Sequence, residues 1–167
     1  MDARTASDAT GKNTTTTERK SEREVVTTRT INGPARLVFD AWSKPELFQR
    51  WWVPKSMGMT LLVCEMDVRT GGRYRLVFKV GDATPEFFGK YLEVTPNSRL
   101  VWTNDEGEGG PAVTTLTFEE KGGKTLLVLH ERHPSKEATD EGIGFGEGLR
   151  EMFGQLDELL VTLPAAR

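Results

Sequence analysis

Histidine and acidic side chains near position 130 are the first candidates for chemistry. His130 and His133 are the two histidines of the sequence, and Glu131 lies between them. Two imidazoles and a carboxylate are ligands that zinc accepts. Residues three apart on a strand point to opposite faces, however, so the two rings would diverge unless His133 lies beyond the strand end. We therefore expect no metal and no cofactor here, and interpret the histidines as ordinary residues at a strand end.

Covalent catalysis is not favoured by the remaining side chains. A nucleophile needs a neighbouring base and an orienting group, and the sequence has no Gly-x-Ser-x-Gly elbow. Cys64 is the single cysteine and has no nearby histidine. We interpret it as a small buried hydrophobic residue, and we assign no catalytic residues.

A glycine-rich stretch at residues 142–148 invites comparison with phosphate-binding loops. The spacing fails the Gly-x-Gly-x-x-Gly pattern, and the acidic residues at 140, 141 and 147 would repel a phosphate. Because each glycine weakens a helix by ~1 kcal/mol relative to alanine, we expect residues 140–148 to fray or bend. Phe145 would then move as a lid over any pocket beneath it.

Aromatic side chains are the strongest sign of a binding function. Most must belong to the core, but those beside a gap would contact a ligand. Tyr91 and Glu131 would supply the few polar contacts of such a pocket. The aromatic candidates are Trp51, Trp52, Tyr74, Phe78, Phe87, Trp102 and Phe145.

A long amphipathic helix over residues 140–163 is the element that must cover these side chains. Its apolar residues recur at steps of three and four, which is the helical period. They are Phe145, Leu149, Met152, Leu156, Leu159 and Leu163. Polar residues that suit water fall on the opposite face, among them Gln155 and Asp157. Pro164 is a stop signal.

Seven strand-like segments precede this helix. They cover residues 25–31, 59–68, 72–80, 86–94, 99–104, 112–119 and 124–132, and two short helical segments lie near 34–42 and 46–50. Turn residues separate the last six strands closely, which indicates an antiparallel meander. The sequence therefore predicts an α+β fold with a curved seven-stranded sheet wrapped around the C-terminal helix. Room should remain at one end, where the two short helices close the gap.

Composition sets the remaining limits. The 167 residues are 37% hydrophobic and 28% charged, as in an ordinary globular domain. A net charge of −3 argues against a nucleic-acid partner, and no apolar run approaches the ~20 residues of a membrane span. With no secretory signal and one cysteine, we expect a cytoplasmic protein. We expect residues 1–21 to be a disordered polar tail and residues 22–164 to form one domain.

Several segments resemble one known superfamily. They are residues 29–34 (RTINGP), 38–42 (VFDAW), 45–47 (PEL), 51–54 (WWVP), 65–74 (EMDVRTGGRY), 89–94 (GKYLEV), 99–103 (RLVWT) and 155–159 (QLDEL). In this pattern the chain resembles the helix-grip superfamily called SRPBCC or START-like. Within it, the chain is similar to the branch named after the activator of the heat shock protein 90 ATPase. The resemblance covers residues 22–163.

This resemblance implies a helix-grip fold and three kinds of function. Members carry small apolar ligands, cyclise polyketides or bind other proteins, and they share no catalytic motif that transfers to this sequence. The chaperone activator itself has a further N-terminal domain, where this chain has only a short polar tail. We therefore expect chaperone activation to be absent or weak.

Our hypothesis is a protein that binds a small apolar or aromatic molecule between sheet and helix, without a membrane or nucleic-acid partner. A cyclase- or hydrolase-type enzyme using the same cavity, or a domain that binds a chaperone, are the alternatives. The predicted cavity residues are Trp51, Trp52, Tyr74, Phe78, Phe87, Tyr91, Trp102, Leu116, Leu129, Glu131, Phe145 and Met152.

Overall fold

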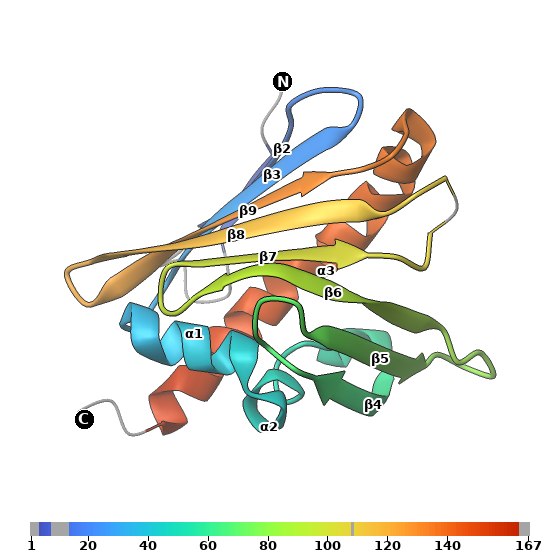
Figure 1. Cartoon of the computed structure of the whole chain (residues 1–167). Helices are drawn as coiled ribbons and strands as arrows, with labels where there is room; N and C mark the ends of the chain where they lie inside the picture. Colours follow the sequence, from blue (N-terminus) through green and yellow to red (C-terminus); the bar gives the residue numbers. More distant parts are fainter. Residues whose placement is uncertain (1–3, 8–13, 108, 164–167) are drawn as a thin grey trace.

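The computed structural model describes residues 4–7, 14–107 and 109–163, with the backbone alone described for residues 4–7 and 144–147. Within these residues the chain forms one nine-stranded sheet, two short helices, a 3-10 turn and one long helix (Figure 1). In chain order they are β1 (Arg4–Ser7), β2 (Thr14–Arg19), β3 (Glu24–Ile31), α1 (Ala35–Ser43), α2 (Pro45–Phe48), η1 (Lys55–Met57), β4 (Thr60–Met66), β5 (Arg73–Lys79), β6 (Glu86–Thr95), β7 (Arg99–Asn104), β8 (Ala112–Lys121), β9 (Lys124–Arg132) and α3 (Lys136–Thr162).

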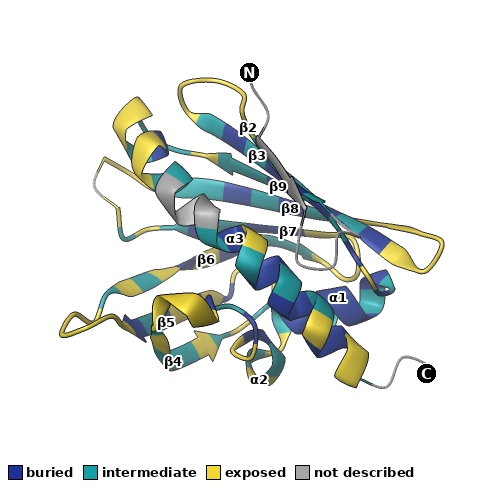
Figure 2. Ribbon diagram, turned by 180° about the vertical axis from the view of Figure 1, so that it is seen from behind, coloured by how far each residue is buried: buried dark blue, intermediate teal, exposed yellow. Residues whose placement is uncertain are grey.

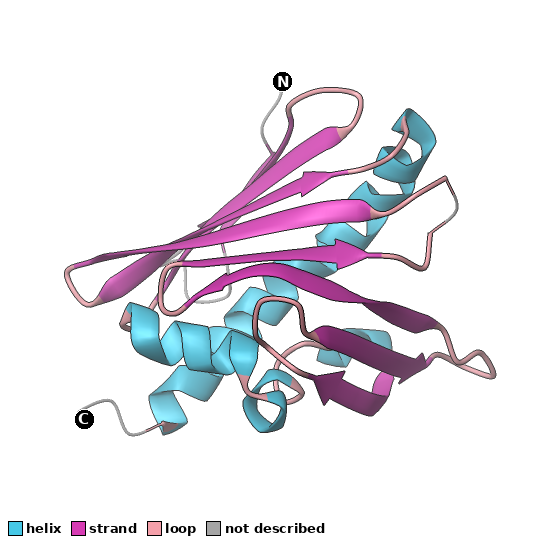
Figure 3. Cartoon of the chain, in the orientation of Figure 1, coloured by secondary structure: helices cyan, strands magenta, loops and turns pink. Residues whose placement is uncertain are grey.

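The sheet is antiparallel at every pairing, in the order β1-β2-β3-β9-β8-β7-β6-β5-β4. Strands β3 to β9 are the seven predicted from the sequence, and β4 to β9 form the predicted meander. Between β8 and β9, Gly122 and Gly123 have φ angles of 60° and 80°. Two left-handed residues in a row make the tight turn that matches the twist of a hairpin. The predicted α+β class is confirmed (Figure 3).

Two parts of the polar N-terminal segment form strands that the sequence did not suggest. We expected residues 1–21 to be a disordered tail, but residues 4–7 and 14–19 form β1 and β2, so the described sheet has nine strands rather than seven. β2 pairs with β3, and the Oγ1 atoms of Thr17 and Thr27 lie 3.2 Å apart. Backbone pairing and β-branched threonines stabilise this edge strand without the apolar side chains that our expectation required.

The long helix begins earlier than predicted. It starts at Lys136 rather than at Asp140, because Ser135 caps its first turn. The Ser135 Oγ atom accepts a hydrogen bond from the Ala138 amide at 3.1 Å, which satisfies one of the free amides of the first turn. The helix also continues through the glycine-rich stretch. Apolar periodicity missed this start because the first turn carries charged and small residues.

The predicted apolar stripe of α3 faces the sheet. Figure 2 shows the helix lying across one face of the sheet, with its buried residues mostly in its C-terminal half. The buried apolar residues are Leu149, Met152, Phe153, Leu156, Leu159 and Leu160. They join the core that β3 to β9 and α1 form, so the helix-grip arrangement is confirmed.

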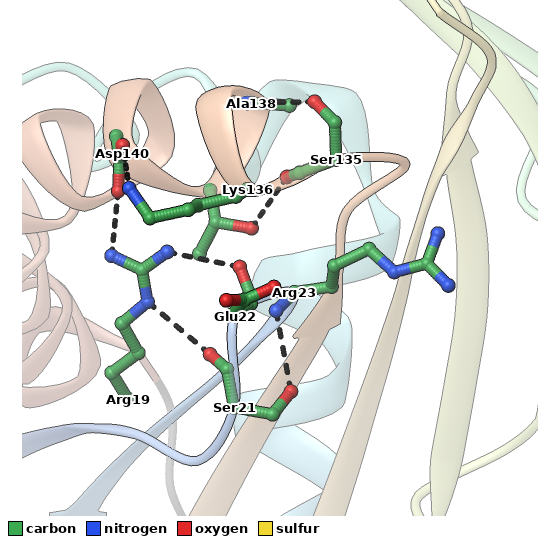
Figure 4. A network of polar contacts seen from close by, with 9 residues as sticks. Arg19, Ser21, Glu22, Arg23, Ser135, Lys136, Ala138 and Asp140 are labelled. Carbon is green, nitrogen blue, oxygen red and sulfur yellow. Dashed lines mark hydrogen bonds and ion pairs between the residues drawn. The ribbon is translucent and has the colours of Figure 1, made fainter.

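Two ion pairs hold α3 against the β2–β3 side of the sheet. Near its start, Arg19 Nη1 lies 2.6 Å from Asp140 Oδ1, within a network that also includes backbone oxygens of residues 21 and 22 (Figure 4). Near its end, Arg29 Nη2 lies 2.7 Å from Asp157 Oδ2. The expectation that Asp157 faces water is therefore wrong. Helical periodicity placed it opposite the apolar stripe, but the curved sheet reaches around the helix to meet it.

Gln155, like Asp157, was expected to face water and does not. It is 8% exposed, and its Nε2 atom donates to the carbonyl oxygens of Trp51 and Val53, both at 2.9 Å. Its Oε1 atom accepts from the Lys55 amide at 2.9 Å. One amide side chain thus fixes the segment that follows α2 against the long helix. This segment carries two of the predicted cavity residues.

Candidate functional site

A cavity of about 410 Å³ lies between the concave face of the sheet and the first half of α3. Residues of α1 and α2 close one side of it, as the fold prediction required. Aromatic and aliphatic side chains make up most of its wall. The aromatic residues that line it are Trp42, Phe48, Trp52, Tyr74, Phe78, Phe87, Tyr91 and Trp102.

Eight of the twelve predicted site residues line this cavity. They are Trp52, Tyr74, Phe78, Phe87, Tyr91, Trp102, Leu129 and Glu131. Strand alternation located most of them, because Tyr74 and Phe78 of β5, or Leu129 and Glu131 of β9, share the inner face of their strand.

Three predicted residues lie in the core and do not line this cavity. Trp51, Leu116 and Met152 are 0% exposed and do not line the cavity. Leu116 and Met152 occupy the region where α3 packs directly on the sheet and leaves no space. Trp51 differs from Trp52 because consecutive residues of a turn point in different directions, and its Nε1–H donates to the Ala41 carbonyl at 2.9 Å. Periodicity alone does not show where along the helix the packing opens.

The last predicted residue, Phe145, lies outside the side chains that the structure describes, and the predicted lid therefore remains a prediction. Two glycines of the same stretch have a visible role. A Cβ atom at Gly142 would lie 2.8 Å from Cε1 of His133, and one at Gly148 would lie 3.1 Å from Cγ of Pro54. Gly142 thus lets α3 approach His133 at the wall of the cavity, and Gly148 lets it approach Pro54 in the segment after α2.

An aromatic cluster forms the wall on the side of α1 and α2. The Trp42 ring contacts Trp52 at a centroid distance of 5.5 Å and Trp102 at 5.8 Å. Phe48 stacks on Trp52 at 4.9 Å. Rings that pack edge to face or stacked hold one another in place, so this wall is preformed and rigid.

Glu131 is the most unusual polar residue of the cavity. On β9 it lies opposite Val25 of β3 and Thr114 of β8, both of which are buried. Within the described part of the chain it has no hydrogen bond or ion pair. Burial away from water disfavours the carboxylate and raises its pKa from 4.5 to about 7. The fold therefore keeps one titratable acid in an aromatic cavity without a protein counter-ion.

His133 also lines the cavity, one residue beyond the end of β9. Its backbone amide donates to the Arg23 carbonyl at 2.8 Å. Its Nε2 atom is buried and has no hydrogen-bond partner among the described residues. Burial, and then the charge of Arg19, lower the pKa of the imidazole. His130, in contrast, lies on the other face, with Nε2 3.6 Å from Glu24 Oε2.

The hydroxyl groups of the two cavity tyrosines, Tyr74 and Tyr91, are poorly suited to act as bases. Tyr74 donates its O–H to the Thr103 carbonyl at 2.6 Å. Burial raises the pKa of Tyr74 well above its usual range, and the charge of Glu106 raises it further. Burial likewise raises the pKa of Tyr91. Both phenols therefore stay neutral at physiological pH, as hydrogen-bonding groups rather than bases.

Cys64 does not supply a nucleophile. Burial raises the pKa of its thiol to about 11, so the reactive thiolate is not formed near neutral pH. Among residues 4–7, 14–107 and 109–163, no group of three or more histidine, cysteine, aspartate or glutamate residues is placed to hold a metal ion.

Sequence reasoning missed several cavity residues. Trp42 ends the short helical segment predicted near 34–42, and nothing in its spacing marks it as a wall residue. Asn104 could have been found, since it continues the alternation of Leu100 and Trp102 along β7. Glu106 and Glu141 come from a loop and from the first turns of α3, where periodicity gives no direction.

Comparison with known proteins supports this description. Residues 32–161 match the family described as Activator of Hsp90 ATPase homolog 1-like protein. A search of curated proteins finds no match. No helix in the described ranges has the length and apolar character needed to cross a membrane.

Solved structures of similar proteins share the fold over nearly their whole length. A Rhodobacter sphaeroides protein superposes with a TM-score of 0.80 at 20% identity, covering 89% of this chain and 98% of that chain. For a Nitrosomonas europaea protein the TM-score is 0.74 at 26% identity, covering 84% and 96%. For a Staphylococcus epidermidis protein it is 0.74 at 25% identity, covering 89% and 96%. The chain belongs to the family of Activator of Hsp90 ATPase homolog 1-like proteins.

Proposed function

We propose that the protein binds a small apolar or aromatic molecule in the cavity beneath α3. The cavity volume of about 410 Å³ is in the range of small-molecule sites, and its wall combines many aromatic rings with a few polar groups. A surface of this kind gains free energy when it exchanges water for an apolar ligand.

The observation that carries the proposal is a set of polar atoms at the wall that have no protein partner. Trp42 is 3% exposed, yet its Nε1 atom has no acceptor in the described structure, and the Nε2 atom of His133 is likewise unpaired. Glu131, which also lines the cavity, has no hydrogen-bond or ion-pair partner among the residues that the structure describes. Buried polar groups are normally satisfied, so unpaired polar groups on three residues that line one cavity favour a site for water or a ligand there.

Native mass spectrometry of the purified protein tests whether a small molecule accompanies it. Binding of an apolar fluorescent dye then tests the location. Ala112→Trp would place an indole inside the cavity, and Thr115→Trp would place one on the opposite face of the same strand, β8. We expect the first variant to weaken dye binding by about tenfold or more, and the second to leave it unchanged. Equal dye binding by both variants and the wild type would place the site elsewhere.

An acid–base enzyme using the same cavity is a second candidate, because Glu131 and His133 both line it. They are two residues apart, roughly 7 Å along an extended backbone, and a carboxyl with a pKa of about 7 suits general acid–base catalysis. Incubation of the accompanying molecule with wild type and Glu131→Gln distinguishes the candidates. An enzyme converts the molecule and the variant does not, whereas a binding protein returns it unchanged. Binding of a chaperone would use a surface outside the cavity and is a separate question.

A further inference from the structure

The ionisable side chains around the cavity are all acids, apart from one histidine and two tyrosines. Glu106, Glu131 and Glu141 line it, whereas none of the described lining residues is a lysine or arginine. The lowered pKa of His133 favours its neutral form. Beside the aromatic wall, the described lining residues therefore carry a negative net charge when their carboxyl groups are ionised.

We propose that the ligand of this cavity is an aromatic or apolar amine in its cationic form, with Glu131 as its counter-ion. This inference rests on the proposed binding function and narrows it to one class of molecule. Glu131 is partly buried, lines the cavity and has no hydrogen-bond or ion-pair partner among the described residues, so a ligand ammonium would satisfy its carboxylate.

The aromatic wall favours the same charge. A cation held against the face of a tryptophan or tyrosine ring is attracted by the quadrupole of the ring. Trp42 and Trp102 are both cavity residues, with ring centroids 5.8 Å apart. Tyr74 and Tyr91 add a second ring pair, at 5.7 Å. An aromatic amine could thus pack its apolar part against these rings and place its ammonium group against a ring face.

Anionic ligands are disfavoured by the same features. A fatty acid or an aryl carboxylate would enter a site with three glutamates and no lysine or arginine among the described lining residues. Its own carboxylate would lose its hydration without gaining a cationic partner. The cavity therefore discriminates between ligands of equal size by the sign of their charge.

The pH dependence of binding depends on what surrounds Glu131. From β3 and β8 it meets Val25 and Thr114, which carry no charge. The titratable groups that line the cavity from the other elements are His133 after β9, Tyr74 on β5, Tyr91 on β6, Glu106 after β7 and Glu141 on α3. Because the tyrosines and the histidine are neutral near pH 7, the groups in the lining whose charge changes with pH are the carboxyl groups. Amine binding should therefore strengthen as pH rises through about 7, where Glu131 loses its proton.

Three probes of matched shape test this inference: 1-naphthylmethylamine, 1-naphthalenemethanol and 1-naphthoic acid. Their affinities for wild type, Glu131→Gln and Glu119→Gln are measured by calorimetry at about pH 6 and about pH 8. Glu119 is an exposed residue of β8 outside the cavity, so its variant matches the change in net charge.

We expect the amine to bind wild type about tenfold tighter than the alcohol at the higher pH, and the acid to bind weakest. Glu131→Gln should reduce amine affinity by about tenfold and leave the alcohol within about twofold, which also shows that the variant is folded. Glu119→Gln should behave as wild type.

Other outcomes separate the two proposals. If the alcohol binds as tightly as the amine, or the acid binds tightest, the inference on ligand charge is wrong and the proposed binding function stands. If Glu131→Gln binds the amine as tightly as wild type does, Glu131 is not the counter-ion of the ligand. If none of the probes binds, both proposals fail.

Discussion

The Nη2 atom of Arg29 lies 2.7 Å from the Oδ2 atom of Asp157, and this ion pair joins β3 to the C-terminal half of α3. The Arg29 side chain is 0% exposed and that of Asp157 is 14% exposed. Asp157 Oδ1 also accepts from the Asn32 amide at 2.8 Å, and Arg29 Nη1 donates to Thr15 Oγ1 at 3.1 Å. One carboxylate thus connects the helix to β3 and the turn after it, and through Arg29 to β2.

Asp157→Asn should therefore destabilise the fold. The substitution removes the charge of Asp157 from its ion pair with the buried Arg29 guanidinium, which costs roughly 3 kcal/mol of unfolding free energy. Urea denaturation followed by circular dichroism measures the change. Asp140→Asn is the matched control, because Asp140 pairs with Arg19 at the protein surface, where solvent screens the interaction. Equal effects of the two variants would contradict the role assigned to the Arg29–Asp157 pair.

Glu131 makes a specific contribution to the pH dependence of stability. Its folded-state pKa is raised from 4.5 to about 7, so between these values the unfolded chain has released the proton that the folded protein still holds. The unfolding free energy must then fall as pH rises from about 4.5 to about 7, and level off above.

Glu131→Gln removes this penalty. Relative to wild type, the variant should gain stability across that pH window, by roughly 3 kcal/mol at most, and keep the gain above about pH 7. Urea denaturation at several pH values measures the difference, with Glu119→Gln as the control for net charge. A variant that is less stable than wild type at high pH would show that Glu131 has a favourable partner in the folded protein.

Glycines of α3 should respond to substitution according to their surroundings. A Cβ atom at Gly154 meets nothing within 4 Å, so Gly154→Ala should stabilise the protein by about 0.5–1 kcal/mol through helix propensity. At Gly142 the added Cβ atom would lie 2.8 Å from His133 Cε1, and the imidazole must move. Gly142→Ala should therefore lose most of this gain and alter the cavity wall. Thermal unfolding of both variants checks the prediction, and similar gains in melting temperature would contradict it.

The sequence predicted the secondary-structure elements of this fold better than the tertiary contacts between them. Alternation and helical period located β3 to β9 and the apolar face of α3, because these patterns report local geometry. The roles of Asp157 and Gln155 depend on how far the sheet curls around the helix, which no local pattern reports. β2 was missed because its threonines carry no apolar signal, although they pair well at a sheet edge.

In the candidate site, too, residues on regular strands could be predicted, whereas residues placed by tertiary contacts could not. Leu129 and Glu131 could be predicted, since β9 alternates regularly. Met152 was misplaced, because the residue spacing of a helix does not show where the sheet stops touching it. His133 and Gly142 are close in sequence, but their contact depends on how the loop after β9 turns back against α3, which no periodic pattern reports.

The indole signals of the four tryptophans provide the most direct test of the central claim, that the cavity beneath α3 binds a small apolar molecule. Trp42, Trp52 and Trp102 line the cavity, whereas Trp51 is buried in the core with its Nε1–H bonded to the Ala41 carbonyl. Proton–nitrogen NMR spectra are recorded during titration with 1-naphthalenemethanol, a neutral probe, for wild type and Ala112→Trp. We predict large, saturable shifts for the three cavity indoles, the smallest shift for Trp51, and loss of these shifts in the variant. Unchanged indole signals at high probe concentration, or a dominant shift of Trp51, would contradict binding in this cavity.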